Sequence, residues 1–98
     1  MSKINNLTKG DKPVLIDFYA DWCGPCQTMA PVLEKVRQKM GNRMSLVKIN
    51  VDKKKAMASA QNVRSIPTLV LYKNGKPVWR KSGLATARDI IQALEKQM

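Results

Sequence analysis

The sequence predicts a three-layer α/β domain, in which helices cover both faces of a central sheet. Three observations support this fold class. One strand-like segment is apolar on both faces, helix-like and strand-like segments alternate along the chain, and an Asn-Gly turn joins the last two strands. The 98 residues contain no repeat, low-complexity tract or Pro/Gly/Ser-rich linker, so we expect a single domain over residues 1–98.

The first strand is predicted over residues 14–20, Val-Leu-Ile-Asp-Phe-Tyr-Ala. Its β-branched and aromatic residues leave neither face polar, which is typical of a central strand. A helix follows the motif Trp22-Cys23-Gly24-Pro25-Cys26, because apolar residues then recur at helical spacing. These residues are Met29, Val32, Leu33, Val36 and Met40. Gly41-Asn42 is expected to end the helix.

The second half of the chain continues the alternation. We expect a strand over residues 46–51, a short helix over 53–61 and a third strand over 68–72. Asn74-Gly75 predicts a hairpin turn to a fourth strand over 78–81. A last helix over 86–96 is capped by Thr86, and its inner face is Ala87, Ile90, Ile91 and Leu94. The helical crossovers imply that the strands before the hairpin are parallel, and the hairpin adds an antiparallel edge.

Composition excludes several classes of site. The sequence has no histidine, which excludes Ser-His and Cys-His hydrolysis, and two cysteines cannot complete a tetrahedral zinc site unless two chains share the metal. No apolar run approaches the ~20 residues that span a bilayer, and the N-terminus has no apolar signal core. We therefore expect a soluble, cytoplasmic protein. The net charge of +11 leaves nucleic acid or acidic partners open.

The two cysteines lie where the first strand meets the long helix. Pro25 suits the first helical turn, and Cys23 then lies at the positive helix end, which should lower the pKa of its thiol. We expect an exposed attacking Cys23 with Cys26 shielded behind it. A structural disulfide over two intervening residues would contribute only roughly 2 kcal/mol. Two cysteines could also be half of a zinc site, but the sequence lacks the other ligands. The context favours a redox-active pair over both alternatives.

Two charged residues and one proline stand out elsewhere. Asp17 interrupts the apolar first strand, where burial should raise its pKa. It is either a strand residue that reaches a partner such as Lys48, or a proton relay for Cys26. Lys48 also interrupts an apolar strand and, on its own, is best interpreted as solvated. Pro67 precedes the third strand, and a cis bond after Ile66 has a prior of only ~5%.

These residues together resemble the thioredoxin family. The likeness covers nearly all of the chain from Val14 onward, in the family's order. It rests on Asp17–Asp21, Trp22–Cys26, Pro31, Lys48–Asp52, Val63–Thr68, Lys73–Gly75 and Ser82–Leu84. The resemblance implies the thioredoxin fold, with a shortened N-terminal segment. Residues 1–12 have room for an edge strand, a helix or a curtailed version of both.

The resemblance also implies roles for individual residues. Cys23 is the nucleophile and Cys26 the resolving thiol, together forming the redox disulfide. Asp17 assists proton transfer at Cys26, and Lys48 is its partner. The substrate-binding surface comprises Trp22, Gly24, Pro25, Ile66, Pro67, Gly83 and Leu84, with Ile66-Pro67 as a cis-proline loop.

The implied activity is protein-disulfide reduction by dithiol–disulfide exchange, which maintains cell redox homeostasis. We expect a monomer that acts on disulfide-containing clients, with no nucleic acid, no membrane, no metal and no bound cofactor. NADPH acts indirectly, through a flavoprotein thioredoxin reductase that recycles the disulfide.

Two other functions remain open at this stage. One is a disulfide oxidant or isomerase in an oxidising compartment, although the Gly-Pro pair between the cysteines favours reduction. The other is a basic binding module. Its basic residues would be Lys35, Lys39, Arg43, Lys53–Lys55, Lys73, Lys76, Arg80 and Lys81. They are spread over several elements, so a solvated surface or steering of acidic clients explains them better.

Overall fold

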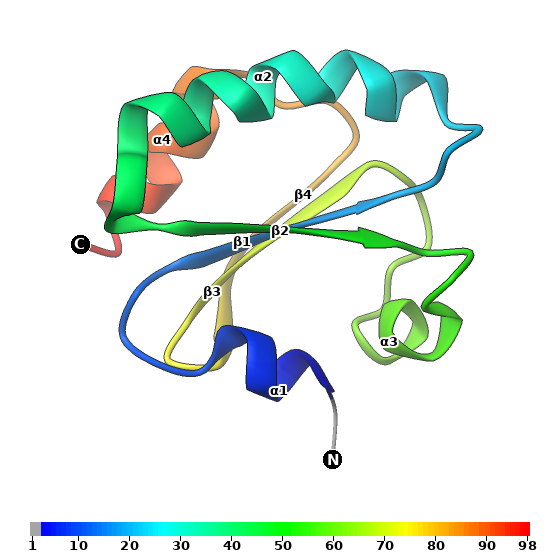
Figure 1. Cartoon of the computed structure of the whole chain (residues 1–98), viewed down its shortest axis with the longest axis horizontal. Helices are drawn as coiled ribbons and strands as arrows, with labels where there is room; N and C mark the ends of the chain where they lie inside the picture. Colours follow the sequence, from blue (N-terminus) through cyan, green and yellow to red (C-terminus); the bar gives the residue numbers. More distant parts are fainter. Residues whose placement is uncertain (1–2) are drawn as a thin grey trace.

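A four-stranded mixed sheet forms the middle layer of the protein (Figure 1). The computed structural model describes residues 3–98; Met1 and Ser2 of the expected domain lie outside the described residues. The strands are β1 (Val14–Tyr19), β2 (Ser45–Asn50), β3 (Thr68–Lys73) and β4 (Lys76–Ser82). The helices are α1 (Lys3–Thr8), α2 (Gly24–Met40), α3 (Lys55–Ala60) and α4 (Ala87–Glu95), with a 3-10 turn at Gly41–Arg43. Helices α2 and α4 cover one face and α1 and α3 the other, which confirms the three-layer architecture.

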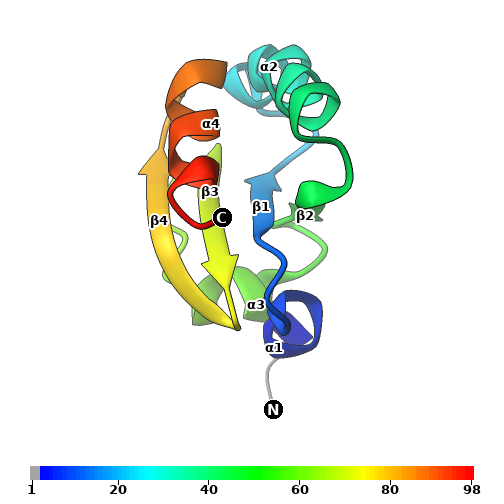
Figure 2. The ribbon, with the colours of Figure 1, turned by 90° about the vertical axis from the view of Figure 1, so that its left-hand side faces the viewer.

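The strands lie in the order β2-β1-β3-β4, so β2 and β4 are the two edges (Figure 2). β1 is parallel to β2 but antiparallel to β3, and β3 is antiparallel to β4. The prediction of parallel strands before the hairpin is therefore correct for β1 and β2 and wrong for β3. Asn50 lies opposite Tyr19, and Thr68 lies opposite Phe18. The chain therefore leaves β2 and enters β3 at the same end of the sheet. The short α3 does not carry it back along the sheet.

β1 is buried on both faces, as its sequence predicts. Leu15 packs in the apolar cluster formed with α2 and α4, whereas Ile16 and Phe18 pack in the cluster on the opposite face. None of the three side chains is accessible to solvent. Full burial of each such side chain contributes ~1.5–3 kcal/mol. The strand that leads into the cysteine motif is therefore held firmly from both sides.

The long helix α2 follows its predicted pattern closely. Its buried apolar residues face the sheet, and they are Met29, Leu33, Val36 and Met40. Cys23 is the N-cap, and Gly41, with φ +59°, follows the last helical residue. A positive φ at this position favours glycine and ends the helix.

The other turns and caps also match the sequence. Asn74 and Gly75 both have positive φ, at 55° and 79°, as a type I′ hairpin requires. Thr86 caps α4 by accepting a hydrogen bond from the backbone N–H of Asp89 at 3.1 Å. Of the inner face expected for α4, Ile90 and Leu94 are buried, while Ala87 and Ile91 are half-buried.

Residues 3–12, which the sequence left open, contain the helix α1 and no strand. The side chain of Ile4 inserts into the apolar cluster beneath β1. Thr8 is fully buried and accepts a hydrogen bond from the Gly75 N–H at its carbonyl. Helix α1 thus packs under the sheet, and β2 is an outer strand of the sheet that residues 3–98 form.

Candidate active site

Cys23 and Cys26 form a disulfide in the turn between β1 and α2. Their Cα atoms are 5.3 Å apart, within the range that disulfides require. The backbone N–H of Cys26 donates to the Cys23 sulfur at 3.1 Å, so this sulfur takes the position of an N-cap acceptor. Pro25 lies in the first turn, where its missing N–H leaves no carbonyl unpaired. The helix end therefore directs a backbone donor at one sulfur of the pair.

Both cysteines are almost enclosed in this oxidised form. Cys23 is 3% exposed and Cys26 is 7% exposed. The expectation of an exposed Cys23 in front of a shielded Cys26 is therefore wrong for the disulfide state. The reason is local packing, because Ala20 is buried with the disulfide while Tyr19, Val51 and Ile66 pack against it.

Trp22 lies beside this cluster and is 71% exposed. Its indole Nε1–H donates to Asp52 Oδ2 at 2.8 Å, which fixes the ring next to the end of β2. A pocket of about 370 Å³ lies between Trp22 and the Ile66 loop, lined also by Val51, Val63, Arg64 and Ser65. A large exposed aromatic ring held at one edge is suited to contact another protein.

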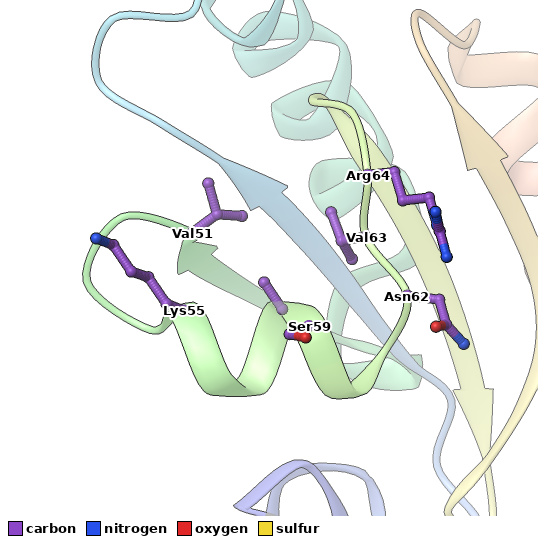
Figure 3. A pocket seen from close by; sticks show the side chains of 7 residues that line it. Val51, Lys55, Ser59, Asn62, Val63 and Arg64 are labelled. Atoms are coloured by element: carbon purple, nitrogen blue, oxygen red, sulfur yellow. The ribbon is translucent and has the colours of Figure 1, made fainter.

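A second pocket, of about 320 Å³, adjoins the first along α3 (Figure 3). Val51, Val63 and Arg64 line both pockets, and Lys55 and Ser59 belong only to the second. The surface next to the disulfide is therefore lined by the side chains of Val51 and Val63 together with the basic residues Lys55 and Arg64. Val51 and Asp52 were not predicted at this site, because nothing in their local sequence pattern signals contact with Cys23 or Trp22.

The Ile66–Pro67 peptide bond is cis, as the resemblance implied. The Pro67 carbonyl accepts from the Gly83 N–H at 2.8 Å, which joins the proline loop to the Gly83-Leu84 segment. The backbone N–H and C=O of Ile66 have no hydrogen-bond partner within residues 3–98. Leu84 is 54% exposed. The loop thus presents the unpaired backbone groups of Ile66 beside the disulfide cluster, against which Ile66 packs.

Asp17 is buried in the sheet on the same face as Leu15, with only 2% exposure. Its Oδ1 atom has no hydrogen-bond partner. Burial raises the pKa of this carboxyl to about 6, and the positive charge of Lys48 lowers it by less. Lys48 is the register partner of Asp17 on β2, and its ammonium lies 5.4 Å from the centre of the Tyr19 ring. The structure therefore places both anomalous charges of the sequence side by side.

Part of the expected site comes together beyond the end of β1. Cys23, Cys26 and Ile66 pack in one cluster, and the Pro67 carbonyl joins the proline loop to Gly83. Asp17 lies two residues before the end of β1. Gly24 and Pro25 are exposed beside the disulfide. Among residues 3–98, no group of three His, Cys, Asp or Glu side chains is placed to hold a metal ion. Within the same range, no helix is long and apolar enough to cross a membrane.

Comparison with known proteins gives a consistent result. The family model Thioredoxin matches residues 3–96. Thioredoxin Y, a chloroplastic protein of Oryza sativa subsp. japonica, is 44% identical over 92 residues, covering 94% of this chain and 55% of the rice protein. This chain therefore spans little more than half the length of that relative. A thioredoxin-like protein of Synechocystis is 49% identical over 89 residues, covering 91% of this chain and 85% of the relative.

Solved structures agree. A mutant thioredoxin from Halobacterium salinarum superposes with a TM-score of 0.86 at 39% identity, over 96% of this chain and 81% of the other. Oxidised mitochondrial thioredoxin 3 from Saccharomyces cerevisiae gives 0.85 at 34% identity, over 96% and 87%. A cysteine pair at disulfide distance in this fold is consistent with dithiol–disulfide exchange. The chain belongs to the thioredoxin family.

Proposed function

We propose that the protein reduces disulfides of client proteins by dithiol–disulfide exchange at Cys23 and Cys26. The observation that carries the proposal is the disulfide at the start of α2, where the Cys26 N–H donates to the Cys23 sulfur. In the reduced protein this donor and the helix end favour a thiolate at Cys23. A thiolate is the form that attacks a disulfide.

The exchange has two steps. The Cys23 thiolate attacks one sulfur of the client disulfide, which forms a mixed disulfide and releases the other client sulfur as a thiolate that takes up a proton. Cys26 then loses its proton and attacks the Cys23 sulfur, which releases the second client thiol. Two electrons pass to the client, whose disulfide becomes a dithiol, and the Cys23–Cys26 disulfide forms again.

Asp17 is proposed to accept the proton of Cys26 in the second step. It lies on the sheet face that α2 covers, it is buried, and its Oδ1 is unpaired. A carboxyl with a pKa of about 6 is ionised at neutral pH and is a stronger base than an ordinary aspartate. Lys48, its neighbour on β2, is proposed to limit how far that pKa rises.

Client docking is proposed on the surface around the disulfide, where Trp22, Gly24, Pro25 and Leu84 are exposed and Pro67 itself is buried. The surface comprises Trp22, Gly24, Pro25, Ile66, Pro67, Gly83 and Leu84. The unpaired backbone groups of Ile66 suit an extended client segment that carries the disulfide. The apolar side chains of Trp22 and Leu84 would flank that segment.

Thioredoxins need no bound cofactor, and we propose that reduction equivalents come from NADPH through a flavoprotein thioredoxin reductase. A structural neighbour comes from work on thiol resolution in a yeast mitochondrial 1-Cys peroxiredoxin via glutathione/thioredoxin systems, which supports a protein client. We place the protein in the cytoplasm, as a monomer that maintains redox homeostasis. Two of the relatives named above are a chloroplastic protein of rice and a protein of Synechocystis.

A trapping experiment tests the proposal. With Cys26→Ser the second step is blocked, so the variant should accumulate a mixed disulfide with a protein substrate such as insulin. Mass spectrometry should locate that bond at Cys23. Cys23→Ser is the matched control, and it should not form this adduct within the time that Cys26→Ser needs to form it. Equal trapping by both variants, or by neither, would contradict the assigned order of attack.

A further inference from the structure

The outer edge of β2 offers unpaired backbone groups. β2 pairs only with β1 among the described strands (Figure 2). The N–H groups of Ser45 and Val51 donate to carbonyls before and at the end of β1. Because strand residues alternate, the N–H and C=O groups of Leu46 and Lys48 face away from β1. No hydrogen bond within residues 3–98 uses those outer groups.

The opposite edge of the sheet is obstructed. β4 contains Pro77, which has no N–H, and its pairing register shifts between Leu71 and Tyr72. Proline and irregular pairing are devices that block the addition of another strand. β2 has no proline and keeps an unbroken register with β1 from Ser45 to Asn50. A further strand can therefore pair with β2 more readily than with β4.

A groove of about 560 Å³ runs beside the β2 edge. Its apolar lining includes Val47 of β2, Met57 of α3 and Leu7 of α1, and Leu7 is 41% exposed. Side chains of an added strand point alternately to the two faces of a sheet. Every second side chain of such a strand would enter this groove.

The charge of the groove selects an acidic occupant. Lys48, Lys53 and Lys54 line it, and none of the chain's seven acidic side chains does. Asp52, next along the chain to Lys53, is hydrogen-bonded to Trp22 instead. A second copy of this chain would set the same lysines against one another, so charge disfavours self-pairing.

The groove also adjoins the disulfide. Tyr19 lines the groove and packs against the cluster of Ala20, Cys23 and Cys26. We propose that the open edge of β2 docks an extended, acidic segment of a client protein, which joins the sheet as a fifth strand beside the active site. That the partner is a client protein rests on the function proposed above, whereas the addition of a strand to β2 does not depend on it.

The first test uses the oxidised protein and a probe without cysteine. The probe is the acetylated, amidated hexapeptide Glu-Val-Glu-Ile-Glu-Thr, followed by NMR at constant ionic strength. We expect saturable shifts centred on the Leu46 and Lys48 amides. Two N-methylated peptides, blocked at alternate residues, serve as a matched pair. One should lose binding and the other should keep it, because only one set of N–H groups faces β2.

Charge reversal supplies the second control. The double variant Lys53→Glu/Lys54→Glu should bind the peptide at least about fivefold more weakly. Lys76→Glu with Lys81→Glu changes the net charge equally at the β4 edge and should have less than about a twofold effect. Equal weakening by both pairs, or shifts spread over the whole surface, would overturn the proposal. Protection of the Leu46 and Lys48 amides by self-association without peptide would also overturn it, since the occupant would then be a second copy.

A kinetic test separates docking from redox function. The reduced protein is mixed with a disulfide client carrying the acidic hexapeptide, and with a small aromatic disulfide. Docking predicts that Lys53→Glu with Lys54→Glu raises KM for the tagged client only. If docking is wrong, both disulfides react at rates unaffected by this variant. If the redox function is wrong, neither disulfide is reduced, while the peptide-binding result stands unchanged.

Discussion

Replacing Asp17 by asparagine removes a buried carboxylate whose charge destabilises the folded protein. The pKa of this carboxyl rises from its ordinary value of 3.8 to about 6 in the folded protein, because burial penalises the charge more than Lys48 favours it. The folded state therefore binds this proton more tightly than the unfolded state. At ~1.36 kcal/mol per pH unit, ionised Asp17 lowers the free energy of unfolding by about 3 kcal/mol.

Because folding raises the pKa of Asp17, the destabilisation depends on pH in a defined direction. The cost is absent below pH 3.8, grows as pH rises towards 6, and is constant above that value. The Asp17→Asn variant has no such titration. The difference between its free energy of unfolding and that of the native protein should therefore rise by about 3 kcal/mol from pH 3.5 to pH 7. With an m-value of ~1–3 kcal/mol per molar urea, the midpoint difference grows by about 1 to 3 M.

The assay is urea unfolding of both oxidised proteins in parallel at several pH values. Asp21→Asn is a matched control, since Asp21 is exposed just beyond the same strand. Its effect at pH 7 should stay within about 0.5 kcal/mol. A difference between Asp17→Asn and the native protein that is flat over pH 3.5–7, or that shrinks as pH rises, would show that burial of Asp17 does not raise its pKa.

Three further changes have defined outcomes. Leu33→Ala removes a buried α2 side chain, which is 2% exposed, and should lower the free energy of unfolding by ~2–5 kcal/mol in urea unfolding. Thr86→Ala removes the acceptor of the Asp89 N–H and should cost ~1 kcal/mol, whereas Thr86→Ser should restore most of it. Lys48→Met removes the charge that lowers the Asp17 pKa, so NMR titration of the Asp17 carboxyl should give a value above about 6; an unchanged or lower value would exclude the interaction.

The sequence predicted the parts of the fold that rest on local chemistry. The two-sided apolar pattern of β1, the Asn74-Gly75 turn and the Thr86 cap each depend on residues close together in the chain. The direction of β3 does not. It depends on whether α3 spans the sheet, and six residues are too few to do so. A short helix and a crossover helix have the same periodicity, so pattern alone cannot distinguish them.

In the candidate site too, features that depend on nearby residues were predicted and features that depend on distant residues were not. The spacing of Cys23 and Cys26 predicted their proximity, because three residues at a helix start bring them together. Their equal enclosure was missed, since Val51 and Ile66 reach the disulfide from distant parts of the chain. The cis bond at Pro67 came from family resemblance, because an X–Pro sequence carries only a small cis preference of its own. The roles of Asp17 and Lys48 stay predictions, although the structure pairs the two residues.

The reduction potential of the Cys23–Cys26 couple decides whether the protein reduces or oxidises client disulfides. Equilibration with defined glutathione buffers, with the dithiol and disulfide forms quantified by mass spectrometry after alkylation, gives the value. Thioredoxins that reduce proteins have potentials of about −270 mV, and the proposed function predicts a value in that region. A potential at or above about −180 mV would instead mark a disulfide donor or isomerase and would contradict the account.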